Sequence, residues 1–267
     1  MKNKFSTIES IIRTSKNGGM YILVDDEQKE NEGDIVLPAS KVTPQKINFM
    51  TKYARGLICL TLDSKQVEKL NLSLMSPENN ARFKTAFTVS IEAAKGITTG
   101  ISAFDRSKTI RTAIKKNVKR KDIVTPGHVF PIIAKDGGVL VRAGHTEASV
   151  DISKISKCGS AAVICEILSE DGTMARRNEL FRFAKKHNLK IGTIEDLIKY
   201  RLQKEQFIKL KKTSTIVIKN QNFKIKIFEN LLDNNEHFAL IKGNLNKATP
   251  RVRVISSNIV QNYLLNQ

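Results

Sequence analysis

The segment from Val24 to Asp34, VDDEQKENEGD, contains six carboxylates and one lysine. In an extended chain Glu30, Glu32 and Asp34 share one side, and in a helix Glu30 and Asp34 are neighbours. Carboxylates that converge repel one another unless a cation or a proton lies between them. The segment therefore suggests a raised pKa or a hard divalent metal, Mg²⁺ or Mn²⁺, which prefers oxygen ligands. The alternative is a solvated acidic loop.

Two histidines lie in the glycine-rich segment TPGHVFPIIAKDGGVLVRAGHTEASVD. Glycines around His128 and His145 let the backbone approach a ligand closely. Arg142 and Thr146 add a guanidinium and a hydroxyl, which suit phosphate oxygens. The combination favours a binding site over two structural histidines.

Glu166 interrupts the apolar run AAVICEIL. A carboxylate in such a strand is unfavourable unless it is paired, ligated or protonated. It is either the partner of a core arginine or a general acid or base with a raised pKa.

Together these residues predict a hard-metal site with carboxylates, one or two histidines and a phosphate-binding arginine and threonine. Such a site suits proton abstraction beside the carbonyl of a sugar phosphate, with a metal to stabilise the enediolate. The residue types alone leave isomerase, aldolase and lyase open.

The elements that must position these residues are a mixture of helices and apolar strands. A first helix is expected over 6–16, with Ser6 as N-cap and Glu9 three residues later. Strands are expected within 20–24, 55–62, 86–93 and 159–168, and helices within 105–118 and 178–189. Continuous apolar strands mixed with helices indicate a layered α/β or α+β domain, with a sheet covered on both faces. The acidic segment should be a loop at a strand end.

After Arg201 the sequence pattern changes to short segments in which apolar and polar residues alternate, as is typical of β-strands. We expect one domain over 1–201 and a small β-rich segment over 202–267.

Composition limits the classes of function. The chain has 267 residues and a formal net charge of +19, yet its lysines are spread along the whole sequence, Trp is absent and aromatics are 6%. No nucleic-acid-binding motif occurs, so we expect phosphate-bearing small molecules rather than nucleic acid as partners. No apolar run is long enough to span a membrane and no signal peptide is evident, so we expect a cytoplasmic protein without membrane contact. Three cysteines without CxxC spacing predict apolar packing rather than a disulfide framework or zinc site.

Six segments resemble, in order, the motifs of 3,4-dihydroxy-2-butanone 4-phosphate synthases. They are VDDEQKENEGD, TAFTVSIEAAKGITTGISAFDRSKTIR, TPGHVFP, GGVLVRAGHTEASVD, AAVICEILSEDGTMAR and KIGTIEDLIKYR. The resemblance covers 5–201. It implies a riboflavin-pathway lyase that converts D-ribulose 5-phosphate to L-3,4-dihydroxy-2-butanone 4-phosphate and formate. It also implies an α+β, three-layer fold with a twisted mixed sheet, and a homodimer with active sites at the subunit interface.

The same resemblance implies roles for individual residues. Glu30 and His145 would ligate Mg²⁺ or Mn²⁺, with two ions in each active site. Asp34, His128 and Glu166 would be catalytic. Residues implied to bind substrate are Lys29, Glu30, Asp34, Thr98, Arg142, Ala143, Gly144, His145, Thr146 and Glu166. Asp105 and Arg106 would support the site, and Glu32 and Cys59 match positions near it without a definite role.

Two features depart from the family pattern. Lys29 stands where the family usually has arginine, which keeps the charge but loses the bidentate fork, so substrate affinity should change. The tail resembles the start of GTP cyclohydrolase II, but Ile255, Ser256, Ser257 and Asn258 replace a His-Ser-Glu-Cys segment. Without thiolates for zinc, no cyclohydrolase activity is expected, and a separate cyclohydrolase is a possible partner.

Two other functions compete with the lyase. A nucleic-acid-binding module would show steeply salt-dependent affinity, and the clustered acids and missing aromatic platform argue against it. A catalytically dead scaffold would require broken site residues, and apart from Lys29 they are all present.

Overall fold

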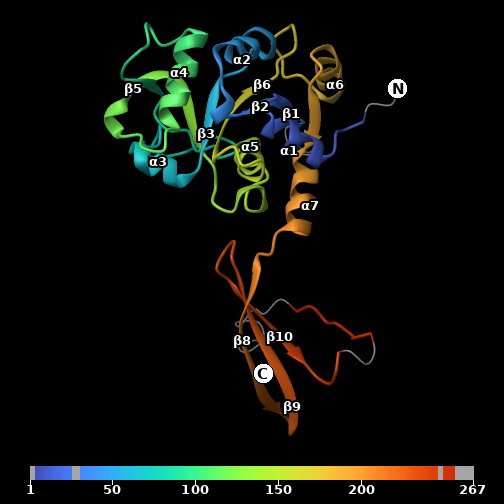
Figure 1. The fold of residues 1–267 in the computed structure, drawn as a ribbon. Coiled ribbons are helices and arrows are strands. Elements are labelled where there is room, and N and C mark those ends of the chain that lie inside the picture. Colours follow the sequence, from blue (N-terminus) through green and yellow to red (C-terminus); the bar gives the residue numbers. More distant parts are fainter. Residues whose placement is uncertain (1–3, 26–30, 246–248, 256–267) are drawn as a thin grey trace. The chain divides into compact units, whose positions relative to one another are not determined.

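The structure is a computed structural model, and it describes residues 4–25, 31–245 and 249–255. The chain divides into two compact units, Met1–Glu205 and Gln206–Gln267 (Figure 1). Each unit is described below by itself.

The first unit contains a seven-stranded mixed sheet in the order β4-β5-β3-β6-β2-β1-β7. Its strands are β1 (Tyr21–Val24), β2 (Gly33–Pro38), β3 (Cys59–Leu62), β4 (Ile91–Ala93), β5 (Ile123–Ile133), β6 (Ala161–Glu166) and β7 (Lys190–Thr193). The pairs β1/β7 and β3/β5 are parallel, and the other neighbours are antiparallel. Its α-helices are α1 (Ile8–Lys16), α2 (Pro44–Phe49), α3 (Ser64–Leu70), α4 (Ala103–Ala113), α5 (His145–Ile155), α6 (Arg177–Lys186) and α7 (Ile194–Lys204).

Both faces of this sheet are buried, because successive side chains of each central strand enter different apolar clusters. In β1, Ile22 and Val24 belong to one cluster, whereas Tyr21 and Leu23 belong to the other. Side chains of α2, α3, α4 and α6 pack into the first cluster. Those of α1, α5 and α7 pack into the second. The three-layer α+β prediction is confirmed.

The N-terminus of α1 differs from the prediction by one residue. Thr7, rather than Ser6, caps α1, and its hydroxyl accepts a hydrogen bond from the Ser10 amide. The amide of Ser6 instead donates to the carbonyl of Ile191 in β7. This bond ties the residue before the helix to the sheet, which moves the cap one residue along the chain.

The segment 86–93 is less regular than its alternating pattern predicts. Only Ile91–Ala93 forms a strand, and the register with β5 shifts between Ile91 and Glu92. Thr88 pairs with Leu74 through an isolated bridge instead. The irregularity turns Glu92 toward the neighbouring strand β5, and its consequence is described below.

The second unit contains a three-stranded antiparallel sheet in the order β10-β9-β8. Its strands are β8 (Ile208–Ile218), β9 (Gln221–Asn230) and β10 (Glu236–Ile241). This agrees with the expected β-rich segment. In the part of the chain that the structure describes, no helix is long and apolar enough to cross a membrane.

Candidate active site

Asp34 and Glu166 are directly opposite each other in the antiparallel pairing of β2 with β6. Directly opposite residues share one face of the sheet, with Cβ atoms about 5 Å apart. Asp34 is buried at 3% exposure, and Glu166 is half-buried at the end of its strand. Asp34 therefore lies within a strand and not in the loop expected from the sequence. The pair brings together two of the predicted catalytic residues.

The Glu166 carboxylate is held by the backbone just before β3. Its Oε2 accepts a hydrogen bond from the Leu57 amide at 2.8 Å. No ion pair to Glu166 occurs within the described residues, so the alternative of a core arginine partner is not supported. A Cβ on Gly56 would lie 2.4 Å from the Glu166 carbonyl oxygen, so this approach depends on glycine.

Two buried thiols lie near this pair. Burial raises the pKa of Cys59 and of Cys165, and the charges of Glu166 and Asp34 raise both further. Both side chains remain neutral thiols and pack as small apolar groups, as predicted for cysteines in this sequence.

The sheet register also relates His128 to the carboxylate pair. Phe130 of β5 pairs with Cys59 of β3, and Cys59 pairs with Ile164 of β6. His128 comes two residues before Phe130 in β5, and Glu166 comes two residues after Ile164 in β6. Since β3 lies between these two strands, His128 and Glu166 lie at the same end of the sheet, on either side of β3.

His128 has a carboxylate partner that the sequence analysis missed. Its Nδ1 contacts Oε1 of Glu92, which lies at the register shift between β4 and β5. A Cβ on Gly127 would lie 2.2 Å from the Ile91 backbone, and a Cβ on Gly100 would overlap the Glu92 carboxylate. Gly100 and Gly127 therefore leave the space that the Glu92 side chain needs to reach His128. The signal available in the sequence was a glutamate in an alternating strand just before a glycine-rich turn.

Thr98 is held by Asp105 in the turn before α4. Its hydroxyl and amide donate to the two Asp105 carboxylate oxygens at 2.7 and 3.1 Å, and the Gly100 amide donates at 3.1 Å. The Thr98 hydroxyl is the main cause that lowers the pKa of Asp105. Arg106, the next residue, donates to the Thr51 hydroxyl at 2.9 Å. Asp105 thus holds the turn that carries Thr98, and its support of the active site stays a prediction.

The predicted phosphate-binding residues surround the N-terminus of α5. Gly144 is the N-cap, and His145 and Thr146 are the first two helical residues. The free amides and the dipole of a helix N-terminus favour an anion. A Cβ on Gly144 would lie 2.5 Å from Arg142 Nη1, so the Arg142 guanidinium lies directly beside the N-cap of α5. Ala143 packs against the apolar cluster beneath α5.

Arg142 is oriented by Glu147, whose role the sequence did not reveal. Its Nη1 donates to Glu147 Oε2 at 2.7 Å, while the Lys135 amide donates to the other carboxylate oxygen at 3.0 Å. Glu147 is 1% exposed. A buried carboxylate held at both oxygens fixes the guanidinium in one place, which is the preorganisation that phosphate binding needs.

Metal ligation is tested only in part by the structure. Lys29 and Glu30 lie outside the described residues, so the expected metal ligand Glu30 and the substituted Lys29 are not placed. The described residues contain no group of three or more His, Cys, Asp or Glu that could hold a metal ion by themselves. A hard cation bound near Asp34 and Glu166 would be favourable, because a positive charge stabilises two opposed carboxylates.

The fold and site define a class of protein: a three-layer α+β domain with two opposed carboxylates, a carboxylate-bound histidine and an anchored arginine at a helix N-terminus. Residues 9–200 match the family described as 3,4-dihydroxy-2-butanone 4-phosphate synthase. The chain belongs to this family.

The protein of this name from Neisseria meningitidis serogroup A is 51% identical over 238 residues, covering 89% of this chain and 66% of that protein. The chain thus spans slightly less than two thirds of that relative's length. The crystal structure of RibBX, a two-domain 3,4-dihydroxy-2-butanone 4-phosphate synthase from A. baumannii, is 45% identical. It superposes with a TM-score of 0.87 and covers 97% of this chain and 76% of that one.

A structure of 3,4-dihydroxy-2-butanone 4-phosphate synthase in complex with two magnesium ions is 36% identical, with a TM-score of 0.72. That match covers 75% of this chain and 98% of that one.

Proposed function

We propose that this protein is a carbon–carbon lyase that converts D-ribulose 5-phosphate to L-3,4-dihydroxy-2-butanone 4-phosphate and formate in riboflavin biosynthesis. The observation that carries the proposal is the opposition of Asp34 and Glu166 on one face of the sheet in a chain of this family. Together the two products contain every atom of the substrate. The reaction therefore needs acid and base groups but no second substrate.

Asp34 and Glu166 are the proton-transfer groups of this proposal. The Leu57 amide holds one oxygen of Glu166 and leaves the other for substrate. Asp34, opposite it, binds substrate hydroxyls and moves protons between them. Two carboxylates whose Cβ atoms lie about 5 Å apart on one face can reach adjacent carbons of one sugar, as enolisation followed by dehydration requires.

His128 serves the other side of the substrate. The Glu92 carboxylate fixes the tautomer and orientation of its imidazole, with Nδ1 directed to Glu92 and Nε2 left to exchange a proton. The exposed His128 side chain is accessible to a small molecule.

The phosphate group is assigned to the N-terminus of α5. Arg142 and the Thr146 hydroxyl supply donors, Gly144 and His145 line the approach, and Ala143 supports it from the apolar side. Thr98, held by Asp105, completes the substrate contacts.

Glu30 and His145 are the proposed metal ligands, for two ions of Mg²⁺ or Mn²⁺. When bound, the metal would act as a Lewis acid on the ketose oxygens. The relative in complex with two magnesium ions supports the choice of magnesium and the number of ions. Lys29 is proposed to contact the substrate as a point charge, without the bidentate fork of arginine.

A homodimer with the active site at the subunit interface is part of the proposal. Leu57, whose amide holds Glu166, has a side chain that is 42% exposed, and Phe104 near Thr98 is 57% exposed. Apolar side chains exposed around a polar site are typical of a surface that a second subunit covers. Size-exclusion chromatography with light scattering should give twice the chain mass; a monomer that retains full activity would contradict this part.

The second unit is proposed to have no cyclohydrolase activity. Residues 1–201 form the proposed synthase domain, and 202–267 carry no cysteine with which to bind a catalytic zinc ion. A separate cyclohydrolase would supply the GTP-derived precursor, and both enzymes would work in the cytoplasm. Pyrimidine formation from GTP by the purified protein with zinc would contradict this assignment.

The proposed function is tested by identifying the products. Ribulose 5-phosphate and Mg²⁺ are incubated with the protein and followed by ¹H and ³¹P NMR. We expect formate and a four-carbon ketone phosphate to appear in equal amounts. A pentose phosphate isomer without formate would instead indicate an isomerase.

A further inference from the structure

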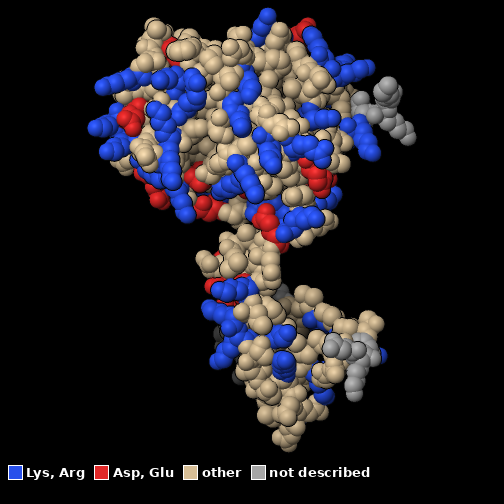
Figure 2. All heavy atoms as spheres, in the orientation of Figure 1, with Lys and Arg blue, Asp and Glu red and all other residues tan. Residues whose placement is uncertain are grey.

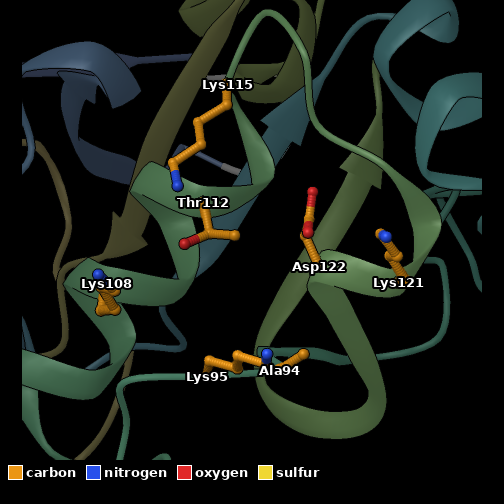
Figure 3. A pocket seen from close by; sticks show the side chains of 7 residues that line it. All are labelled: Ala94, Lys95, Lys108, Thr112, Lys115, Lys121 and Asp122. Atoms are coloured by element: carbon orange, nitrogen blue, oxygen red, sulfur yellow. The ribbon is translucent and has the colours of Figure 1, made fainter.

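A hollow lined mainly by lysines lies beside α4, among residues that the proposed reaction does not use. Its volume is about 360 Å³, within the range of small-molecule sites, roughly 300–1,000 Å³. The lining residues are Ala94, Lys95, Lys108, Thr112, Lys115, Lys121 and Asp122. Figure 3 shows Lys108, Thr112 and Lys115 on the α4 side, with Lys121 and Asp122 opposite them.

Four lysines and one aspartate are among the residues that line this hollow. Asp122 is engaged locally, since its Oδ2 accepts a hydrogen bond from the Lys119 amide at 2.8 Å. Within the described residues, none of the four lysines forms an ion pair. By contrast, the exposed Lys199 lies 2.7 Å from a Glu195 oxygen. The hollow therefore has about three uncompensated positive charges whose repulsion an anion would relieve.

The dipole of α4 accounts for the position of only one of the four lysines. Lys115 lies just after the end of α4, where the helix dipole favours a cation. Lys95 and Lys121 come from other segments, and Lys108 lies in the middle of α4. Figure 2 shows lysine and arginine side chains spread over the visible face, so positive charge alone does not mark a site. Convergence of three segments on one hollow is what distinguishes these four lysines.

The chemical class of the ligand follows from the lining. Lysines act as point charges for phosphate oxygens, and the Thr112 hydroxyl makes no hydrogen bond within the described residues. The seven lining residues include no aromatic side chain on which a base could stack. We propose that this hollow binds a small polyphosphate anion carrying three or four negative charges.

This site is separate from the proposed substrate site, which uses Arg142 and the N-terminus of α5. The two share one border, because Lys95 and Gly96 lead into the turn that carries Thr98. A Cβ on Gly96 would lie 3.2 Å from the Lys108 side chain, which places this turn against the lysine cluster.

The test is calorimetric titration with inorganic tripolyphosphate at about 0.1 M salt, where charges farther apart than roughly 10 Å are screened. One variant carries Lys108→Gln and Lys115→Gln. The matched control carries Lys65→Gln and Lys69→Gln, which removes two charges from exposed positions on α3. We expect one saturable site per chain that weakens at least tenfold in the α4 variant and less than twofold in the control. Both variants should unfold at the same temperature as the original protein.

Three outcomes would overturn the proposal. If tripolyphosphate binding weakens equally in both variants, or does not saturate, the anion responds only to the net charge of the protein. Displacement by ribulose 5-phosphate, together with loss of binding in Arg142→Gln, would mean that tripolyphosphate occupies the substrate site. Because binding is measured without turnover, the result does not depend on the proposed function.

Discussion

Asp34 of β2 lies directly opposite Glu166 of β6, so two carboxylates face each other on one side of the central sheet. Like charges in this position are destabilising by about 0.2–1 kcal/mol. The role proposed for this pair is to move protons on a ketose phosphate beside a cation.

Replacing Asp34 with asparagine should separate activity from stability. Asp34→Asn removes the cross-strand repulsion and keeps the size of the side chain, so the free energy of unfolding without metal should change by no more than about 1 kcal/mol. Formate release should fall by about 10²-fold or more, because a proton-transfer group is lost. Urea denaturation and a formate assay measure both quantities. Glu68→Gln, an exposed acid on α3, should change neither; full activity in Asp34→Asn would contradict the assigned role.

Gly100 and Gly172 offer a matched pair for the His128 site. Both have positive φ, +91° and +85°, so alanine should strain each backbone by about 1 kcal/mol. Only at Gly100 does the added Cβ meet the Glu92 carboxylate and approach His128 Nδ1 at 2.7 Å; nothing lies within 4 Å of the same atom at Gly172.

We therefore expect Gly100→Ala to lower kcat at least tenfold, whereas Gly172→Ala should retain kcat. Steady-state kinetics checks the difference, with circular dichroism to confirm folding. Equal kcat in the two variants would show that the contact between Glu92 and His128 does not position the imidazole.

Thr98 should contribute stability that depends on pH. The Thr98 hydroxyl is the main cause that keeps the pKa of Asp105 below its ordinary value of 3.8. Since the folded pKa lies below the unfolded one, the stabilisation is complete above the unfolded pKa. It is lost as the pH falls through the folded pKa.

The free energy of unfolding of the original protein should exceed that of Thr98→Val by a constant amount above about pH 5. This difference should decrease below pH 3.8. Urea unfolding at pH 6 and pH 3 measures this difference, and Thr99→Val, on the exposed neighbour, is the control. A difference that increases in acid would contradict the assignment to the Asp105 carboxylate.

Arg201 should be the most stabilising ion-pair residue of the first unit. Its Nη1 lies 2.7 Å from the buried Asp151 carboxylate, and its Nη2 lies 2.6 Å from Glu205. Arg201→Met leaves Asp151 as a buried charge without its cation, which costs about 3 kcal/mol or more. Lys199→Met breaks an exposed pair and should change stability by less than about 1 kcal/mol. Similar losses in the two variants, measured by urea denaturation, would show that burial does not strengthen the Arg201 pair.

The sequence allowed prediction of the layers, because these depend on local patterns, whereas the roles of the site residues stay predictions. Apolar runs such as MYILV and SAAVICE report burial on two faces, and His128 and His145 are marked by glycines that admit a ligand. Contacts between distant segments were not accessible in this way. The opposition of Asp34 and Glu166 depends on sheet register, and Glu92 reaches His128 only because the register between β4 and β5 shifts. Glu147 follows Thr146 in the sequence, but its contact with Arg142 depends on the turn before α5.

We propose that Asp34 and Glu166 cleave ribulose 5-phosphate with the help of a metal ion. The initial rate of formate release tests this most directly. It is recorded with Mg²⁺, with excess chelator, and in Glu30→Ala beside the control Glu68→Gln. We predict release with Mg²⁺ in the original protein and in the control. Release should be abolished by chelator and restored by added Mg²⁺, and it should fall at least 10²-fold in Glu30→Ala. Undiminished formate release in chelator, or full activity in Glu30→Ala, would contradict the account.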